Sequence, residues 1–198
     1  MRHICYVTGT RADFGLMRRT LEGVHKSLDL RLSIIATGMH LDARYGLTVR
    51  EIEAAGLPVE ARLPMLGRNT PTGYTMALDI SRMLAGMTDA FERLKPDLVL
   101  LLGDRGEMLA GAIAALHLNI PTTHIHGGER SGTVDESVRH AISKLSHFHF
   151  TATPQSQERL VRMGEAPQQV FVTGAPGLDG IVQDAVIPRA DLLSGQRF

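Results

Sequence analysis

The sequence predicts an α/β domain built on a doubly wound, Rossmann-like parallel sheet of about seven strands. Short apolar runs alternate with longer segments of helical periodicity, which is typical of βαβ units. Most of the expected helices begin at a capping motif, and glycines with polar neighbours follow most of the expected strands. The chain has 198 residues, which is the size of one domain. We assign this domain to residues 1–187, because residues 188–198 lack a strong periodic pattern.

The expected strands are short and rich in β-branched and aliphatic residues. They are His3–Thr8, Arg31–Thr37, Val59–Leu63, Asp97–Leu102, Thr122–Ile125, Phe148–Thr153 and Gln169–Thr173.

The expected helices show apolar residues at a spacing of three or four. They are Asp13–Leu28, Leu47–Ala55, Tyr74–Leu94, Glu107–Leu116, Val134–Ser146 and Gln155–Met163. In the first, Leu16, Leu21, Val24 and Leu28 are expected on the buried face. The capping motifs are Thr10-x-x-Asp13, Asp104-x-x-Glu107, Thr133-x-x-Glu136 and Thr153-Pro154. The segment Met65–Gly73 is predicted to be a surface loop and a candidate flap.

Composition excludes several classes of function. Lys and Arg number 21 and so do Asp and Glu, and a net charge of zero argues against an electrostatic nucleic-acid binder. The longest apolar run, Leu98–Leu102, is far shorter than the ~20 residues of a membrane span, so we expect no membrane association. The single cysteine, Cys5, lies in an apolar run and is expected to be a buried thiol in a reducing compartment. We therefore expect a cytoplasmic protein.

In an open parallel sheet, ligands bind beyond the carboxyl ends of the strands. The segments expected there are polar and contain glycine: Thr8–Arg11, Thr37–His40, Gly103–Arg105, His126–Arg130 and Thr173–Pro176. Arg11, Ala12 and Phe14 stand where a dinucleotide fingerprint needs glycine, which argues against NAD. The start of the first helix at Thr10 and Arg11 suits either an anion or an ordinary capped helix with a surface arginine.

The stretch His124–His140 concentrates ionisable side chains around a Gly-Gly turn. They are His124, His126, Glu129, Arg130, Asp135, Glu136, Arg139 and His140. Their spacing matches no zinc motif, so general acid and base chemistry is favoured over a metal site. Taken singly, Asp104, Asp135 and Glu136 also fit a purely structural role at helix starts. His147 and His149 are interpreted as packing or surface residues.

Four motifs together carry a family resemblance. They are Tyr6-Val-Thr-Gly-Thr-Arg-Ala-Asp-Phe-Gly15, Ala36-Thr-Gly-Met-His40, Leu102-Gly-Asp-Arg105 and the run from His124 through His126-Gly-Gly-Glu129 to His147. In this order they resemble the N-terminal half of the hydrolysing UDP-N-acetylglucosamine 2-epimerases of sialic acid synthesis. The resemblance implies one half of a glycosyltransferase-B type fold. Residues 188–198 would then begin the linker to a C-terminal nucleotide-binding domain absent from this chain.

The resemblance implies conversion of UDP-N-acetylglucosamine to N-acetylmannosamine and UDP by elimination and hydration. It implies catalytic positions at Asp104, Glu129, Asp135, His126 and His140. Implied substrate-binding positions are Gly9, Arg11, His40, Arg105, Gly127, Gly128, Glu136 and Arg139, with Arg11 facing the diphosphate. Family members place a glutamate where this sequence has His126, so either Glu129 or His126 takes that role. No metal or other cofactor is implied, and a homodimer or tetramer is expected.

Two other functions stay open at this point. The first is the hydrolysing 2-epimerisation of UDP-N,N′-diacetylbacillosamine, a sugar with a 4-acetamido group and a 6-deoxy carbon. The second is a nucleotide-sugar binding module without turnover, because catalysis at a cleft between domains needs both walls.

Overall fold

A computed structural model describes residues 1–65 and 72–181 of the chain. It contains a seven-stranded parallel sheet in the order β3-β2-β1-β4-β5-β6-β7, which confirms the predicted doubly wound fold. The strands are β1 (Arg2–Thr8), β2 (Leu30–Thr37), β3 (Val59–Leu63), β4 (Leu98–Leu102), β5 (Thr122–Ile125), β6 (Phe148–Thr151) and β7 (Val170–Val172). Each predicted strand is present, with its bounds shifted by two residues at most.

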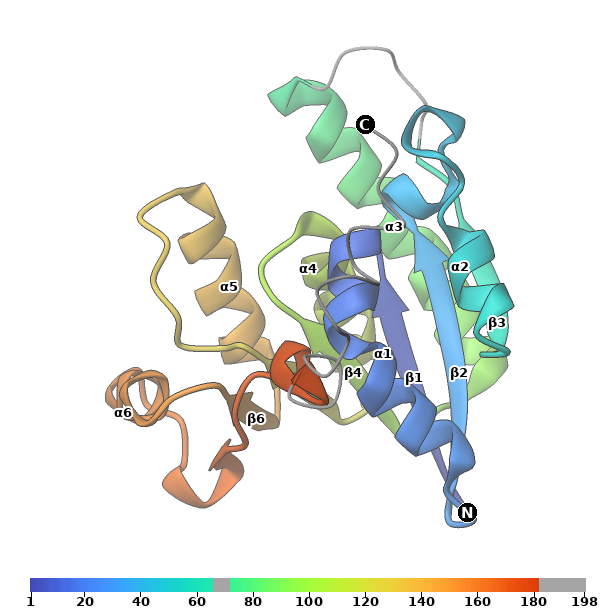
Figure 1. Cartoon of the computed structure of the whole chain (residues 1–198). Coiled ribbons are helices and arrows are strands. Elements are labelled where there is room, and N and C mark those ends of the chain that lie inside the picture. Colours follow the sequence, from blue (N-terminus) through green and yellow to red (C-terminus); the bar gives the residue numbers. More distant parts are fainter. Residues whose placement is uncertain (66–71, 182–198) are drawn as a thin grey trace, which may run out of the picture.

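Helices cover both faces of the sheet (Figure 1). The α-helices are α1 (Arg11–Lys26), α2 (Val49–Ala54), α3 (Gly73–Leu94), α4 (Gly106–His117), α5 (Val134–Leu145) and α6 (Pro154–Arg162). Residues of α1 and α2 pack on one face, and those of α3, α4 and α5 pack on the other. The described residues also form four 3-10 helices that the sequence did not predict: η1 (Gly38–Leu41), η2 (Ala43–Tyr45), η3 (Pro167–Gln169) and η4 (Pro176–Leu178).

The core consists of one apolar layer on each side of the sheet. Alternate residues of β1 pack on opposite faces of the sheet. Cys5 and Val7 pack in the layer with α3 and α4, whereas Tyr6 packs in the layer with α1. Cys5 is fully buried, as predicted. Burial raises the pKa of its thiol to about 12, so Cys5 acts as a small apolar residue.

The buried face of α1 differs from the prediction. Phe14, Met17 and Leu21 are buried, whereas Leu16 is 40% exposed and Leu28 is 94% exposed. The helix ends at Lys26 because Ser27 is extended, so Leu28 lies beyond it. Phe14, Met17 and Leu21 lie on the buried face of the helix, and Leu16 lies beside that face. The prediction was wrong because it grouped Leu16 with Leu21 on one face.

The caps of α1 and α6 are confirmed. Thr10 and Asp13 form a complete capping box, and the Thr153 side chain caps a helix with proline in its first turn. Thr133 also caps α5, but Glu136 accepts from two N–H groups before Thr133 instead of closing a box. The predicted Asp104 cap is wrong, because α4 begins at Gly106 after Arg105 and no side chain caps it.

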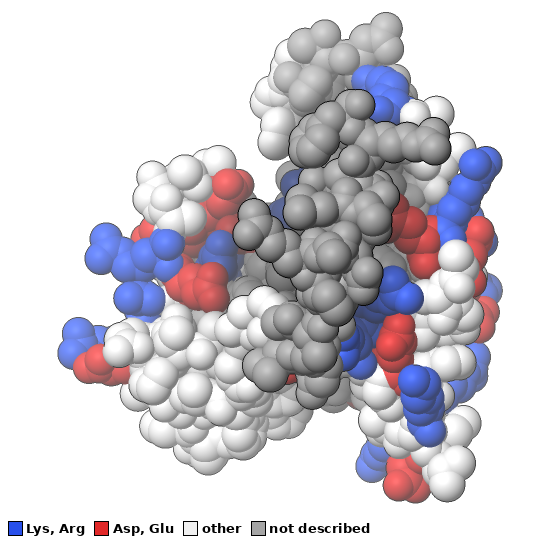
Figure 2. Space-filling model, viewed as in Figure 1, with Lys and Arg blue, Asp and Glu red and all other residues white. Residues whose placement is uncertain are grey.

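Two predictions lie wholly or partly outside the described residues. These are residues 66–71 of the expected flap and the proposed linker at 188–198. Within the described ranges, no helix combines the length and the apolar character that a membrane span requires. Acidic and basic side chains are interspersed over the face shown in Figure 2, in keeping with a net charge of zero.

Candidate active site

The loops that follow β1, β2, β4 and β5 meet at the carboxyl edge of the sheet. The chain leaves β1 toward β2 on one side and enters β4 on the other, so a crevice opens between β1 and β4. This topological switch point is where doubly wound folds bind ligands. The loop after β1 carries Gly9 and Thr10, and the loop after β4 carries Asp104 and Arg105.

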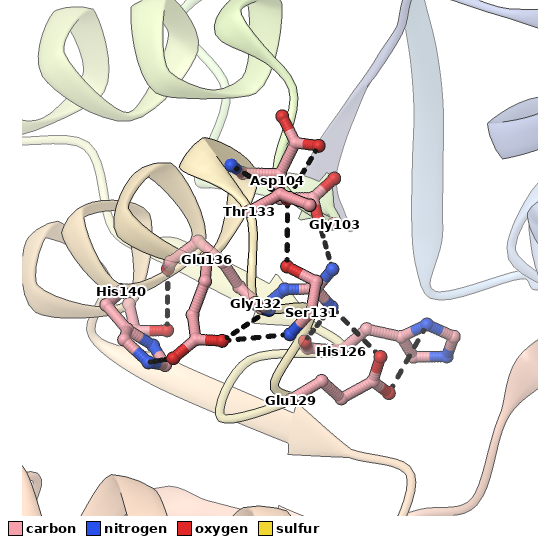
Figure 3. A network of polar contacts seen from close by, with 12 residues as sticks. Gly103, Asp104, His126, Glu129, Ser131, Gly132, Thr133, Glu136 and His140 are labelled. Atoms are coloured by element: carbon pink, nitrogen blue, oxygen red, sulfur yellow. Dashed lines mark hydrogen bonds and ion pairs between the residues drawn. The ribbon is translucent and has the colours of Figure 1, made fainter.

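Arg139 of α5 holds two carboxylates from different loops at this edge. Its Nη2 donates to Asp104 Oδ2, and its Nη1 donates to Glu129 Oε2 at 2.9 Å and to the His126 carbonyl at 3.1 Å. We call Asp104, Glu129, His126 and Arg139 the Arg139 cluster. Figure 3 shows Asp104 on one side of the Ser131–Thr133 loop, and Glu129 and His126 on the other. Two of the three predicted catalytic carboxylates are therefore neighbours.

His126 has a backbone conformation that is rare outside glycine, with φ of +61°. Its Nδ1 lies 3.7 Å from Glu129 Oε1, and its Nε2 is buried without a hydrogen-bond partner among the described residues. Burial lowers the pKa of His126, and Arg139 lowers it further, while the attraction of Glu129 opposes both. A neutral imidazole beside a carboxylate can accept or donate a proton near pH 7.

Two cavities adjoin at Arg105, which lines both. The cluster cavity, about 290 Å³, is also lined by Asp13, Asp104, His126, Glu129 and Arg139. The methionine cavity, about 340 Å³, has an apolar wall of Met39, Met65, Met76, Ile80 and Met83. Arg105, Glu107 and Asp135 are among its polar lining residues. A polar site beside an apolar wall suits a ligand that carries both kinds of group.

The remaining predicted residues of α5 lie apart from the Arg139 cluster. Asp135 lines the methionine cavity, and its backbone N–H donates to Thr133. Glu136 accepts from the N–H groups of Ser131 and Gly132, which are the main cause of its lowered pKa. His140 Nε2 lies 3.8 Å from Glu136 Oε1, so Glu136 and His140 form a second pair (Figure 3).

A buried polar group lies beneath the loop after β1. Asp13 accepts from the Thr8 hydroxyl and from the N–H groups of Gly9 and Thr10. His40 is fully buried, with Nε2 3.0 Å from Thr8 Oγ1 and Nδ1 2.8 Å from Thr48 Oγ1. Burial raises the pKa of Asp13 to about 6 and lowers that of His40 to about 4. His40 has no exposed surface in the described structure, and its substrate contact stays a prediction.

Arg11 and the glycines of the His126–Arg130 loop also have protein partners. The Arg11 side chain is 74% exposed, pairs with Glu51 of α2 and lines neither cavity. Gly127 packs on His124 and Ser143, and a Cβ on Gly128 would collide with the Ser156 carbonyl. These glycines allow close packing on α5 and α6, and their predicted contact with substrate stays a prediction.

Sequence reasoning missed two buried carboxylates at the switch point, Asp13 and Glu107, because both were interpreted as capping residues. Glu107 is 5% exposed, and Arg105 Nε donates to its Oε1 at 2.9 Å. The glycines at positions 9 and 38 were the available signal, since both leave space that the Glu107 side chain fills. Within the described part of the chain, no three His, Cys, Asp or Glu residues are placed to hold a metal ion.

The chain is similar to known 2-epimerases. The sequence profile described as UDP-N-acetylglucosamine 2-epimerase matches residues 22–195. A Legionella pneumophila protein named UDP-N,N′-diacetylbacillosamine 2-epimerase (hydrolyzing) is 60% identical over 183 residues, covering 92% of this chain and 48% of the relative. A Neisseria meningitidis UDP-N-acetylglucosamine 2-epimerase is 38% identical over 188 residues, covering 95% of this chain and 48% of the relative.

Solved structures share the fold. The crystal structure of UDP-GlcNAc 2-epimerase from Neisseria meningitidis bound to UDP-GlcNAc superposes with a TM-score of 0.82 and 23% identity. The match covers 99% of this chain and 53% of that chain. The present chain thus spans about half the length of the curated relatives it matches.

Proposed function

Because this chain belongs to the UDP-N-acetylglucosamine 2-epimerase family, we propose that the native protein containing it is a hydrolysing 2-epimerase of a UDP-linked N-acetylamino sugar. The observation that carries the proposal is the pairing of Asp104 and Glu129 on Arg139 beside an open cavity at the switch point. A weakly acidic proton on C2 of the sugar can be removed only by a base held within hydrogen-bond reach of it. The cluster cavity offers carboxylates and a neutral imidazole for that step.

The charge balance of the two cavities indicates which part of the substrate lies there. Seven carboxylates and three guanidinium groups line the two cavities: Asp13, Asp42, Asp79, Asp104, Glu107, Glu129 and Asp135, with Arg44, Arg105 and Arg139. An excess of acidic groups opposes a diphosphate but suits a neutral sugar ring that must lose and regain protons. We therefore place the sugar at this edge, and the diphosphate away from these carboxylates.

The reaction proposed is an elimination followed by a hydration. A carboxylate or His126 takes the C2 proton while UDP leaves C1, which forms a 2-acetamidoglucal intermediate. Water then adds to C1, and a proton returns to C2 from the opposite face, giving the free sugar with inverted configuration at C2. Asp104 and Glu129 flank the ring in this scheme, and Asp135 and Arg105 contact it from the methionine cavity.

UDP-N,N′-diacetylbacillosamine is the proposed substrate. The support is the 60% identity to the Legionella pneumophila relative of that name, against 38% to the Neisseria meningitidis UDP-N-acetylglucosamine enzyme. The methionine cavity adds a physical reason, because a 6-deoxy carbon and a second acetamido group gain more from an apolar wall than hydroxyl groups do. UDP-N-acetylglucosamine is the second candidate, supported by the description of the matching family.

Product analysis tests the proposal. The complete native protein is incubated with each UDP-sugar, and UDP and the free sugar are separated and identified. We expect free 2-epimerised sugar and UDP, with a higher kcat/KM for UDP-N,N′-diacetylbacillosamine. A higher kcat/KM for UDP-N-acetylglucosamine would select the second candidate. Recovery of an epimerised sugar still linked to UDP would overturn the hydrolytic step, and equal rates for the isolated 198 residues would show that this half suffices.

A further inference from the structure

Glu107 is a buried carboxylate at a helix position where such groups normally contact water. It is the second residue of α4, and a carboxylate in the first turn gains from the helix dipole without being buried. Here only 5% of the residue is exposed, and the side chain extends under the loops that follow β1 and β2. Burying an unpaired carboxylate costs roughly several kcal/mol of desolvation free energy, as it does for other ions. A function other than capping is therefore expected.

Two glycines make room for this side chain. A Cβ on Gly9 would collide with the Glu107 carboxylate, and a Cβ on Gly38 would lie 3.0 Å from Glu107 Oε1. Gly9 has no positive φ, so its backbone conformation alone does not require glycine. The loops after β1 and β2 are thus shaped around the Glu107 carboxylate.

The partner of Glu107 is Arg105, whose Nε donates to Glu107 Oε1 at 2.9 Å. The terminal nitrogens Nη1 and Nη2 of Arg105 have no partner among the described residues, and the side chain is 41% exposed. Arg139, in contrast, uses both terminal nitrogens on protein groups. Of the two arginines that line the cluster cavity, Arg105 and Arg139, Arg105 is therefore the one whose terminal nitrogens have no partner among the described residues.

A long arginine side chain loses up to about 2 kcal/mol of rotamer freedom when it is fixed. A guanidinium anchored through Nε before the substrate arrives does not lose this freedom on binding. Glu107 can supply that anchor from a rigid position, because the helix and the two glycine loops leave its own side chain little space. The surrounding carboxylates Glu107, Asp13 and Asp104 raise the pKa of Arg105 against the opposing effect of burial.

We propose that Glu107 is a positioning residue that holds Arg105 through its Nε, so that the two terminal nitrogens of Arg105 donate hydrogen bonds to the sugar of the bound UDP-sugar. The inference rests on the proposed function in one respect: it takes a UDP-sugar as the ligand of this edge. Glu107 itself contacts no reacting atom and acts through Arg105.

A double-mutant cycle in the complete native protein tests this role. Four proteins are compared: wild type, Glu107→Ala, Arg105→Ala and the double variant. We expect Glu107→Ala to lower kcat/KM about 10- to 100-fold in the wild-type background, as misplacement of a substrate-binding group does. In the Arg105→Ala background the same change should alter kcat/KM less than about twofold, because the group it positions is already gone. Glu107→Gln keeps an acceptor for Nε and should recover part of the loss.

A matched ion pair serves as control. Arg162 and Glu158 of α6 also form an arginine–glutamate pair, but both are exposed and lie outside the two cavities. Glu158→Ala should leave kcat/KM within about twofold of wild type. Thermal midpoints of all variants are measured in parallel, so that a loss of folded protein is separated from a loss of turnover per folded molecule.

The outcomes separate this inference from the proposed function. Equal losses from Glu107→Ala in both backgrounds would show that Glu107 does not act through Arg105, and turnover in wild type would leave the proposed function standing. If wild type binds a UDP-sugar without hydrolysing it, the proposed function fails. The role of Glu107 is then tested by comparing the dissociation constants of the same four proteins for that UDP-sugar. A protein that neither binds nor converts either UDP-sugar overturns both proposals.

Discussion

Strands β1 and β4 are neighbours in the sheet, yet the aspartates that follow them, Asp13 in the first turn of α1 and Asp104 in the loop after β4, have different partners. Asp13, which is 6% exposed, accepts hydrogen bonds only from neutral donors: the Thr8 hydroxyl and two backbone N–H groups. Both aspartates line the cluster cavity, but Asp104 is held by the Arg139 guanidinium. Asp13 of α1 therefore fixes the backbone of the loop after β1, whereas Asp104 is the carboxylate that contacts the sugar in the proposed reaction.

The largest expected effect comes from Asp104→Asn. In the complete native protein we expect turnover to fall about 10²- to 10⁴-fold, the range for losing a general acid or base. The free energy of unfolding should fall by about 1 to 3 kcal/mol, because a largely buried ion pair is lost while Arg139 keeps its contacts with Glu129 and His126. Turnover with a UDP-sugar and urea denaturation measure the two quantities.

Asp97 provides the control for Asp104. Its carboxylate accepts from the His3 N–H at 2.7 Å at the opposite, amino-terminal edge of the sheet. Asp97→Asn should cost stability and leave turnover per folded molecule unchanged. If Asp104→Asn behaves in the same way, the contrast between the two loops is wrong and Asp104 is a structural residue.

The pH dependence of stability tests the β1 loop. The pKa of Asp13 rises from 3.8 to about 6, so its contribution to the free energy of unfolding declines as pH rises from about 4 to about 6. The pKa of His40 falls from 6.5 to about 4, so its contribution declines as pH falls from about 6.5 to about 4. Each contribution to the free energy of unfolding is on the order of 3 kcal/mol, and the two oppose each other.

Single substitutions should therefore reveal opposite slopes. Relative to wild type, Asp13→Asn should lose more stability at pH 4 than at pH 7, because only the His40 contribution remains. His40→Gln should show the reverse, with a smaller loss at pH 4 than at pH 7. Denaturation in urea at pH 4, 5, 6 and 7 gives the differences. If the free energy of unfolding has the same pH dependence in both variants and in wild type, Asp13 and His40 do not have the pKa shifts given above.

The fold was predictable from the sequence because strands, helices and most caps depend on local pattern. The Thr10–Asp13 box, for example, is set by residues three apart. The site was less predictable, because its contacts join distant loops. Nothing near Asp104 in the sequence indicates that Arg139 binds it, and nothing near Glu107 indicates that Gly9 and Gly38 leave space for its carboxylate. Local pattern assigned both acidic residues to a helix start, whereas tertiary contacts determine what they do.

The smallest expected effect is the loss of stability when a helix cap beside the site is removed, and it differs between Thr10 and Thr133. Thr10 caps α1 from a buried position, being 7% exposed, whereas Thr133 caps α5 from an exposed loop, with 3.3 Å between Asp135 N and Thr133 Oγ1. Water can replace the hydroxyl at Thr133 but not at Thr10, where a lost acceptor leaves a buried N–H unpaired. Thr133→Ala should then cost about 0.5 kcal/mol and Thr10→Ala about 2 kcal/mol in urea denaturation. Equal costs would mean that the loop before α5 is held as firmly as the loop after β1.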